Sequence, residues 1–472
     1  MKQVIILAAA LTLGAAAIWM GGLNQDEGWY LYAANLVSEG CVPYRDFFYT
    51  QGPLMPIVYS AAVSIWQNYG LLGARVFTLL LGFIAIAFFA LVAYRSSESR
   101  EQGRMAAWIT IALLSTNLYH LYYVAIPKTY ALASLFVALG FYLLTFKKSL
   151  TTFVAALALS FASGTRISLG FLLAVVGFYL LFSRKWRLTL IFALGGFIGL
   201  GLIYGPFLLD DRAFAGLIAA QKYHAARGGF DLVWTVGSFS RLVRWYLPIF
   251  FFLPLIFIVK RERFALRCRL PLWGFLAVFV VQMLAPFPYE DYQVPIMGLL
   301  TIFVAVNAPI KSLLPVIIIT FATSFGSPLL EKWSVNGQDR FWSLKKNAYE
   351  LPQLREVAKL IEAEDPGGKE LLTQDLYLAI ETNRKVPEGL EMGPFAILSD
   401  EKWRELLTTC ECPVAALSGY TFAIEPPVCN ERSIDRQLEY WKLLKSRYTL
   451  VAREESFGQN STTLLILKRG ER

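Results

Sequence analysis

Long runs of apolar residues recur along the first 330 residues of the chain and then stop. A helix needs about 20 apolar residues to cross a bilayer, and fewer where flanking side chains reach the interface. The pattern therefore predicts a polytopic α-helical membrane protein with about eleven spans, at 4–22, 70–93, 105–122, 129–146, 150–165, 167–183, 188–208, 245–259, 270–287, 292–308 and 312–329. The first run is longer than the apolar core of a signal peptide, so we expect an uncleaved membrane helix there.

From residue 331 onwards the pattern is that of a small soluble unit. Residues 351–364 have amphipathic helical spacing and end at Asp365-Pro-Gly-Gly, and residues 433–446 predict a further helix. Short runs rich in apolar or β-branched residues predict strands at 371–374, 414–417, 448–452 and 462–467. We therefore expect a transmembrane domain over 1–330 and a soluble α/β domain over 331–472.

Composition and charge support this division. Hydrophobic residues make up 56% and charged residues 17% of the chain, whereas soluble domains carry roughly 25% charged residues. Residues 1–330 hold 24 Lys and Arg but only 12 Asp and Glu, and residues 331–472 hold 20 and 23. The net charge of +9 thus comes from loops that flank membrane helices, and it does not indicate nucleic-acid binding.

The distribution of Lys and Arg among the loops predicts the orientation. With the N-terminus inside, one set of loops carries fifteen of these cations and the other set carries nine, spread over longer loops. Because cytoplasmic loops are enriched in Lys and Arg, we expect a cytoplasmic N-terminus and a periplasmic or extracellular soluble domain. The expected location is the bacterial inner membrane. Merging the stretches at 150–183 into one span would put basic loops on opposite sides, so we treat them as two.

An acidic pair, Asp26 and Glu27, follows the first span directly and opens a long outer loop at 23–69. Charge in the apolar part of a membrane is costly, so such a pair is solvated, paired or functional. One interpretation is that both residues cap an interfacial helix over 27–38. A second apolar segment, 54–66, predicts another interfacial helix in the same loop.

The residues after this pair carry a resemblance to a known family. They are Gly40-Cys-Val-Pro-Tyr44-Arg45-Asp46, Gln51-Gly-Pro53 and, at the start of the second span, Ala74-Arg75. In this order they resemble polytopic glycosyltransferases of the GT-C fold, in the family of protein O-mannosyltransferases and aminoarabinose transferases acting on lipid A. The resemblance covers about residues 20–80 and continues weakly through Lys128-Thr-Tyr-Ala, Thr165-Arg166 and Tyr289-Glu-Asp-Tyr292.

The resemblance implies a GT-C fold, a sugar donor linked to polyprenyl phosphate, and a reaction on the outer face of the membrane. It also implies that Asp26, with Glu27 beside it, is the catalytic carboxylate. The residue chemistry agrees, since a carboxylate can take the proton of an acceptor hydroxyl. Arg75, Lys128 and Arg166 are placed near outer ends of spans, where cations can hold a phosphate. Snorkelling along the bilayer edge is the alternative interpretation of these cations.

The sequence is compatible with a bound divalent metal ion and with none. Many members of the family carry a second acidic residue in the second outer loop, but residues 117–128 contain none. Either His120, or Glu290 and Asp291 next to Tyr292, takes that role, or there is no divalent metal. The alternatives are a packed, hydrogen-bonded His120 and a merely polar turn at 290–291.

The remaining candidate contacts lie in the same outer segments. The full set of expected substrate-binding residues is Tyr44, Arg45, Asp46, Gln51, Arg75, His120, Lys128, Arg166, Glu290, Asp291 and Tyr292. For Arg45 and Asp46, a local ion pair that pins the loop is the alternative. Cys410 or Cys412 can pair with Cys429 in an oxidising compartment, or all three can be free thiols.

The leading interpretation is a membrane glycosyltransferase that uses a polyprenyl-phosphate sugar, with a glycan, a lipid or a protein as acceptor. A transporter or flippase of a lipid-linked molecule also needs charges at the ends of its spans. Transporters usually show inverted repeats, and no two halves of this sequence match. A scaffold with an outer binding domain would not require eleven spans.

Overall fold

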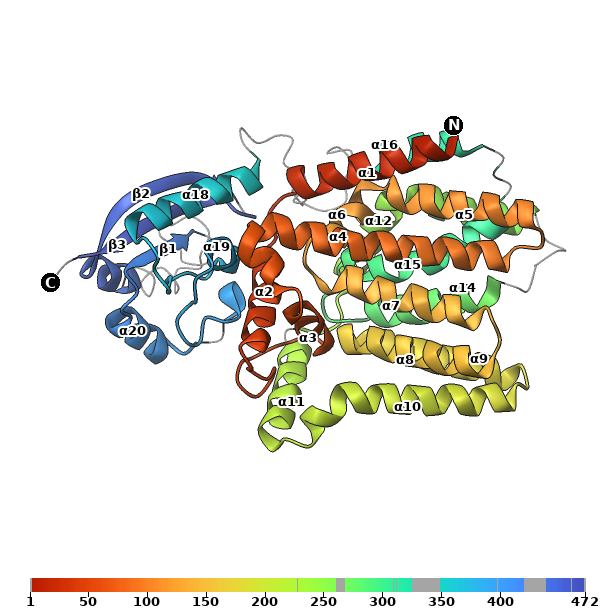
Figure 1. Ribbon diagram of the computed structural model, residues 1–472, viewed down its shortest axis with the longest axis horizontal. Helices are drawn as coiled ribbons and strands as arrows, with labels where there is room; N and C mark the ends of the chain where they lie inside the picture. The colour runs from red at the N-terminus through yellow and green to blue at the C-terminus, as the bar shows by residue number, and fades with distance from the viewer. Residues whose placement is uncertain are drawn as a thin grey trace. The chain divides into compact units, whose positions relative to one another are not determined.

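The computed structural model describes residues 2–226, 228–259, 268–308, 310, 312–324, 349–396, 398–419, 439–459 and 461–470 (Figure 1). The helices are α1 (Lys2–Met20), α2 (Gln25–Ser38), α3 (Leu54–Ser60), α4 (Val63–Ser96), α5 (Arg100–Ser115), α6 (Leu118–Ala125), α7 (Thr129–Leu144), α8 (Ser149–Thr165), η1 (Ile167–Gly170), α9 (Phe171–Phe182), α10 (Trp186–Leu208), α11 (Asp211–Ala226), α12 (Leu232–Trp245), α13 (Leu247–Val259), α14 (Arg269–Met283), η3 (Glu290–Gln293), α15 (Val294–Asn307), α16 (Leu313–Ser324), α18 (Glu350–Glu364), α19 (Leu376–Glu381), η4 (Gly393–Phe395) and α20 (Asp400–Thr409). The strands are β1 (Val414–Ser418), β2 (Tyr448–Phe457) and β3 (Thr462–Arg469).

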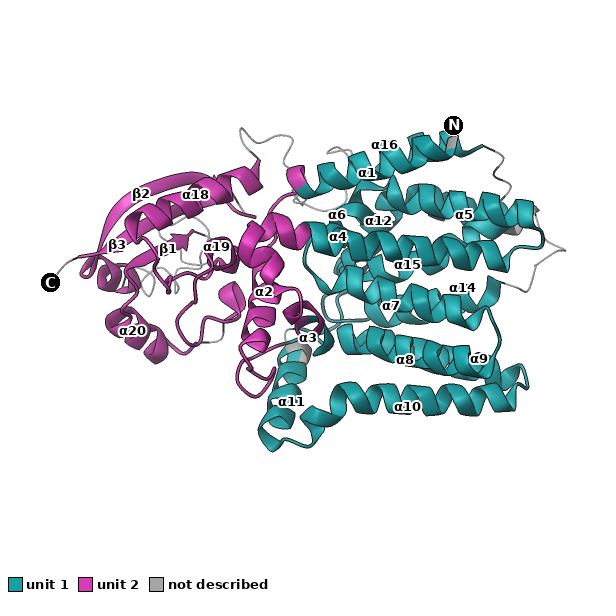
Figure 2. Cartoon of the chain, viewed as in Figure 1, with its two compact units in different colours: residues 1–18, 50–55, 76–339 teal, residues 19–49, 56–75, 340–472 magenta. Residues whose placement is uncertain are grey.

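The chain forms two compact units (Figure 2). Unit 1 comprises residues 1–18, 50–55 and 76–339, and unit 2 comprises residues 19–49, 56–75 and 340–472. Unit 2 therefore combines most of the loop at 23–69 with the C-terminal residues. The domain boundary expected near residue 330 lies outside the described residues and stays a prediction.

Each of the eleven predicted apolar stretches contains a helix. Three helices, α1, α4 and α10, are individually long and apolar enough to cross a bilayer. The pair α6 and α7 and the pair α12 and α13 also qualify, although they are bent by 103° and 89°. The other apolar helices are shorter, so the number of eleven spans stays a prediction.

Small residues bring neighbouring helices of unit 1 close together. Helix α8 packs between α7 and α10. A Cβ added at Gly140 of α7 would lie 2.8 Å from Leu159 Cδ2, and one at Gly199 of α10 would lie 2.6 Å from Ser160 Cβ. Close helix approach at small residues is typical of membrane helices. The loop charges favoured a division of residues 150–183 into two segments. The structure has two helices there, because η1 separates α8 from α9.

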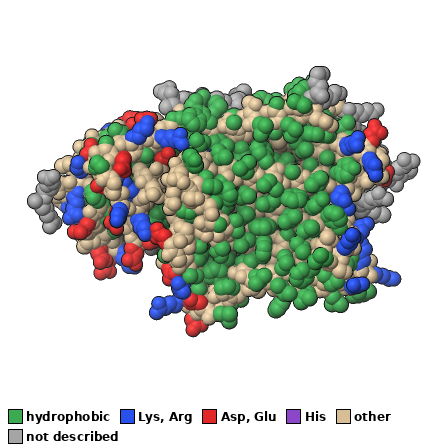
Figure 3. Space-filling view, viewed as in Figure 1, with side chains coloured by type: hydrophobic (Ala, Val, Ile, Leu, Met, Phe, Trp, Pro, Cys, Tyr) green, Lys and Arg blue, Asp and Glu red, His purple; other side chains and the backbone are tan. Residues whose placement is uncertain are grey.

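Three of the predicted basic loops of unit 1 lie at one end of its helices. The loops that join α4 to α5, α7 to α8 and α9 to α10 meet there (Figure 1), and Lys and Arg side chains gather at the same end (Figure 3). The face seen in Figure 3 is otherwise covered by hydrophobic side chains over unit 1. Exposed large hydrophobic residues of this unit include Leu80, Phe178, Leu190 and Phe197. Unit 1 thus has the surface of a membrane protein with its basic loops on one side.

Unit 2 contains an antiparallel sheet of three strands in the order β1-β3-β2. The strands predicted at 414–417, 448–452 and 462–467 are confirmed, as is the helix at 351–364. The strand predicted at 371–374 is wrong. Leu372 forms an isolated bridge to Ala415, and three residues later the Asp375 N–H donates to Thr373 Oγ1 in a local turn before α19. Of the predicted helix at 433–446, residues 439–445 are helical and the first six lie outside the described residues.

Candidate functional site

In unit 2 the acidic pair stands at the N-terminus of α2, where the two carboxylates have different roles. Asn24 is the N-cap: its side chain accepts from the N–H of Asp26 at 3.0 Å, and Glu27 completes a capping box by accepting from the N–H of Asn24 at 3.0 Å. Asp26 does not cap the helix. It is half-buried, and its Oδ1 accepts from Trp29 Nε1 at 3.2 Å.

Glu27 is also half of a buried ion pair. Arg75 donates to both carboxylate oxygens of Glu27, at 2.7 and 2.8 Å, and neither side chain is exposed. The same guanidinium donates to the carbonyls of Gly21 and Gly22 at 3.0 and 2.8 Å. This geometry favours a structural role for both residues over the predicted roles in catalysis and phosphate binding.

The Tyr44-Arg45-Asp46 motif forms a tight turn. Asp46 Oδ2 accepts from the N–H of Val42 at 2.7 Å and lies 2.9 Å from Arg45 Nη2, so the local ion pair is present. The hydrogen bonds from Arg45 and from the Val42 N–H lower the pKa of Asp46. Tyr44 adopts φ +68°, a left-handed conformation that is uncommon for a residue other than glycine.

Aromatic rings of the same loop form a cluster around Tyr49. Trp29 stacks on Tyr30 with ring centroids 3.9 Å apart, and its ring lies 5.2 Å from that of Tyr49. Tyr44 and Phe47 contact the same Tyr49 ring edge-on. Most of the motif therefore builds the core of the loop, and the cluster fixes Trp29, which binds Asp26.

In unit 1 the second group of candidates comes together as one cluster, which we call the cation cluster and define as Lys128, Tyr130, Arg166, Asp291 and Tyr292. Lys128 Nζ lies 3.2 Å from Asp291 Oδ2, and the Tyr130 hydroxyl donates to the same oxygen at 2.8 Å. The Arg166 guanidinium lies between two aromatic rings, 4.9 Å from the centroid of Tyr130 and 4.6 Å from that of Tyr292. The three short motifs in which the family resemblance is weak thus contribute residues that lie close together.

The ends of three helices position this cluster. Lys128 is the N-cap residue of α7, Arg166 is the C-cap residue of α8, and Asp291 lies in η3 directly before α15. Since α7 ends and α8 begins at the basic loops, Lys128 and Arg166 lie at the opposite end of unit 1 (Figure 1). A Cβ at Gly52 would overlap the carbonyl of Gly164, so only glycine allows the Gln51-Gly-Pro53 segment to approach α8 there. Gln51 itself is half-buried.

The cation cluster carries more positive than negative charge in a buried place. Lys128, Arg166 and Asp291 are only 5, 7 and 8% exposed, and they combine two cations with one carboxylate. Arg166 Nη1 also donates to Thr129 Oγ1 at 3.0 Å. Cation–π contacts stabilise such guanidinium groups. The arrangement can bind an anion with charge-assisted hydrogen bonds. Sequence analysis did not select Thr129 and Tyr130, although both belong to the Lys128-Thr-Tyr-Ala motif.

The remaining acidic and histidine candidates have other partners. Glu290 lies 3.0 Å from Arg241 Nε and accepts from the Ser238 hydroxyl at 3.2 Å. Burial raises the pKa of Glu290, and Arg241 opposes that shift. His120 is buried, with its Nδ1 3.0 Å from the Tyr246 hydroxyl, which agrees with a packed, hydrogen-bonded residue.

These side chains do not fit a divalent metal site. Within the described part of the chain, no group of three or more His, Cys, Asp or Glu residues is placed to hold an ion. The two carboxylates at 290–291 are each bound by a cation instead, Glu290 by Arg241 and Asp291 by Lys128.

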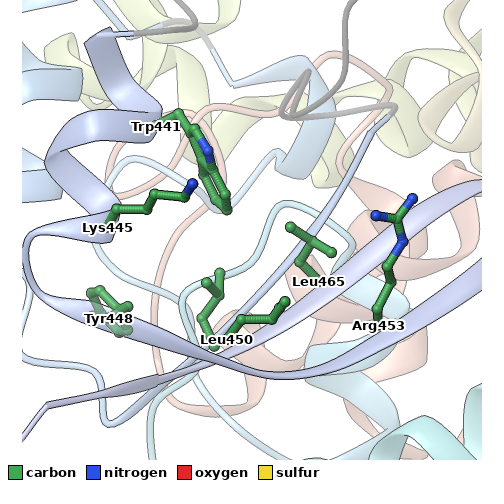
Figure 4. A pocket seen from close by; sticks show the side chains of 7 residues that line it. Trp441, Lys445, Tyr448, Leu450, Arg453 and Leu465 are labelled. Carbon is green, nitrogen blue, oxygen red and sulfur yellow. The ribbon is translucent and has the colours of Figure 1, made fainter.

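Unit 2 has two further features outside the predicted site. A hollow of about 370 Å³ lies on the sheet and is lined by Trp441, Lys445, Tyr448, Leu450, Arg453, Leu465 and Leu467 (Figure 4). Cys410 and Cys412 are buried and form no disulfide with another cysteine of the described ranges, and the N–H of Cys412 lies 3.5 Å from Cys410 Sγ. Hydrogen bonding from Cys412 lowers the pKa of Cys410. The alternative partner, Cys429, lies outside the described residues.

Comparison with known proteins identifies the fold. No protein-family model and no curated protein sequence matches the chain. The solved structure of ArnT from Cupriavidus metallidurans bound to undecaprenyl phosphate matches over 100% of this chain and 99% of its own, with 14% identity and a TM-score of 0.62. The apo state of that ArnT matches with 15% identity and a TM-score of 0.63, over the same shares of both chains.

A third match is the apo form of an Archaeoglobus fulgidus oligosaccharyltransferase. It has 10% identity and a TM-score of 0.52, over 97% of this chain and 74% of that one. These proteins are glycosyltransferases of the GT-C fold. At such low identity the likeness concerns the fold. This chain therefore has the GT-C fold of a polytopic membrane protein, as its sequence motifs implied.

Proposed function

We propose that the protein is a membrane glycosyltransferase that moves a sugar from a polyprenyl-phosphate donor to an acceptor on the outer face of the membrane. The observation that carries this proposal is the cation cluster, which offers buried positive charge for a phosphate at the end of unit 1 opposite the basic loops. The ArnT-like fold over the whole chain supports the same class of reaction.

In the proposed reaction the donor phosphate is the leaving group. As the bond from the anomeric carbon to the phosphate oxygen breaks, negative charge develops on that oxygen. Lys128 and Arg166 stabilise this charge, because preorganised cations in a site with little water act strongly on developing charge. Asp291 holds the ammonium of Lys128 and the hydroxyl of Tyr130 in place.

Asp26 is the proposed base. It accepts the proton of the acceptor hydroxyl while the acceptor oxygen forms its bond to the anomeric carbon, so that polyprenyl phosphate and the glycosylated acceptor are the products. Asp26 is half-buried, and Trp29 Nε1 orients one carboxylate oxygen. Glu27, which is bound to Arg75, is not assigned a chemical step.

The proposed setting is the bacterial inner membrane. The apolar runs predict eleven spans, and the loop charges predict a cytoplasmic N-terminus with the soluble domain of residues 331–472 outside. In that orientation the Lys128 and Arg166 end of unit 1 faces outwards. A polyprenyl tail can then stay in lipid while its phosphate enters the protein.

A transfer assay tests the proposal. Membranes that contain the protein are incubated with polyprenyl phosphates carrying different radiolabelled sugars, and label in product is separated from donor. We expect transfer in wild type and a loss of at least tenfold in Lys128→Ala. Arg212→Ala, an exposed arginine at the start of α11, is the matched control and should behave as wild type.

Two results would contradict the proposal. The first is unchanged transfer in Lys128→Ala, which would leave the cation cluster without a role in donor use. The second is accumulation of intact labelled donor inside sealed vesicles without any sugar transfer, which would identify a flippase.

A further inference from the structure

We infer that the C-terminal residues of unit 2 position the catalytic end of α2, with Glu350, Asp375 and Gln459 as positioning residues for Asp26. The soluble residues would then be a working part of the transferase rather than an appended domain. This inference rests on the proposed role of Asp26 as base, and all of the contacts that carry it lie within unit 2.

The first evidence is the hydrogen bonding at the start of α2. The first N–H groups of a helix have no partner within the helix and need acceptors from elsewhere. Asn24 and Glu27 satisfy two of them locally through the capping box. A C-terminal residue accepts from a third, since Gln25 N–H donates to Gln459 Oε1 at 2.8 Å. Another holds the residue just before the N-cap, where Leu23 N–H donates to Glu350 Oε2 at 2.5 Å.

The second evidence is the side chain of Gln25, the residue directly before Asp26. Its Nε2 donates to Asp375 Oδ1 at 2.6 Å and to the Tyr377 hydroxyl at 3.1 Å. The Tyr377 hydroxyl donates in turn to the same Asp375 oxygen at 3.0 Å. Gln25 is 3% exposed and Asp375 is fully buried, so water cannot replace these bonds easily.

The third evidence is direct packing of α2 on α19. A Cβ at Gly28 would overlap the backbone N–H of Tyr377, so the two helices approach as closely as a glycine permits. Further along α2, the Tyr32 hydroxyl accepts from the N–H of Val386 at 3.0 Å. Helix α2 is therefore held by C-terminal residues at its first turn and again in its second half.

These contacts matter for Asp26 because a base acts only when it is placed correctly. Its backbone lies between Gln25 and Glu27, both of which are immobilised, and its carboxylate binds Trp29. A misplacement of about 1 Å can cost about a hundredfold in rate. Loss of a positioning contact should therefore lower kcat and leave the donor KM nearly unchanged.

Amide hydrogen exchange tests the positioning directly and does not depend on activity. In the full-length protein in detergent, Glu350→Ala should raise exchange in residues 23–27 at least tenfold. Glu350→Gln should keep wild-type protection, because its amide oxygen still accepts from Leu23. The control is Glu356→Ala on the same helix, α18, where the side chain is 70% exposed.

Kinetics of the same variants provide the second readout. We expect kcat to fall about tenfold or more in Glu350→Ala and in Gln459→Ala, with the donor KM within twofold of wild type. Glu350→Gln and Gln459→Glu, which retain an acceptor oxygen, should recover most of the rate. A general loss of folding would instead reduce the yield of active protein and would lower the melting temperature of the conservative variants as well.

The outcomes separate this inference from the proposed function. Unchanged exchange in Glu350→Ala overturns the inference, whether or not the protein transfers sugar. Increased exchange in Glu350→Ala together with a wild-type protein that transfers no sugar upholds the positioning contacts and overturns the proposed function. Increased exchange with an unchanged kcat overturns the link between these contacts and Asp26.

Discussion

Arg75 donates two hydrogen bonds to Glu27, and neither side chain has any exposed surface. Removing one partner of a buried pair leaves an uncompensated charge, which costs about 3–5 kcal/mol. Arg75→Ala should therefore lower the free energy of unfolding by about that amount and reduce the melting temperature in detergent strongly. Arg45→Ala, which breaks the partly exposed pair with Asp46, should cost less than about 1 kcal/mol.

A donor-binding measurement on the same variants separates the two interpretations of Arg75. If Arg75 acts only through Glu27, any folded Arg75 variant should bind donor as wild type does. A stable Arg75→Ala protein with weakened donor binding would restore the phosphate role that the sequence suggested.

Asp26→Asn should lose transfer. General-base catalysis contributes about 10²–10⁴-fold to rate, and an amide cannot take the proton of the acceptor hydroxyl. Expression, melting temperature and donor binding should stay close to wild type, since Asn24 and Glu27 cap the helix and Asp26 does not. Asp211→Asn, at an exposed position in the first turn of α11, is the control. Wild-type turnover in Asp26→Asn would remove Asp26 from the mechanism.

Arg166→Ala should weaken donor use more than acceptor use. A charge-assisted hydrogen bond contributes about 1.5–3 kcal/mol, so the apparent KM for donor should rise roughly ten- to a hundredfold. Arg166→Lys should lie between wild type and Arg166→Ala, because an ammonium keeps the charge but not the planar stacking on Tyr130 and Tyr292. Equal effects on both substrates would mean that the phosphate is held elsewhere.

Asp375 should make stability depend on pH. Burial raises the pKa of Asp375 above its ordinary value of 3.8, although hydrogen bonds from Gln25, Ser418 and Tyr377 oppose the shift. The folded protein therefore holds a proton that the unfolded chain has already released, and stability falls as pH rises from 3.8 through the raised pKa.

Melting temperatures of wild type and Asp375→Asn, compared over that pH range, check this expectation. The difference between the two proteins should change with pH and become constant above the raised pKa of Asp375. A difference that does not vary with pH would show that Asp375 has the same pKa in both states.

The membrane orientation can be tested with reporter fusions. A periplasm-active reporter fused after residue 472 should be active, and one fused within the loop at 147–148 should not. The basis is the gathering of basic loops at one end of unit 1 (Figures 1 and 3). The reverse pair of results would place the C-terminus in the cytoplasm.

Local patterns in the sequence predicted the helices well, because an apolar run long enough to cross lipid can form little else. The motifs also selected Lys128, Arg166 and Asp291, and the structure joins them. The sequence could not predict which charged residues form ion pairs. Glu27, for example, pairs with Arg75, which lies 48 residues further along the chain. The hydrogen bond between Gln25 and Asp375 could not be predicted either, since no periodicity in the sequence relates residues 350 positions apart.

The bond between Gln25 and Gln459 also has a consequence for biosynthesis. The two residues are 434 positions apart, and ribosomes add about 5–20 residues per second, so Gln25 emerges roughly 20–90 s before its acceptor exists. Throughout that interval the backbone N–H of Gln25 must donate to water or to a chaperone instead. Translation that stops shortly before Gln459 would therefore yield a chain that has the helices of unit 1 but lacks one acceptor for the first turn of α2.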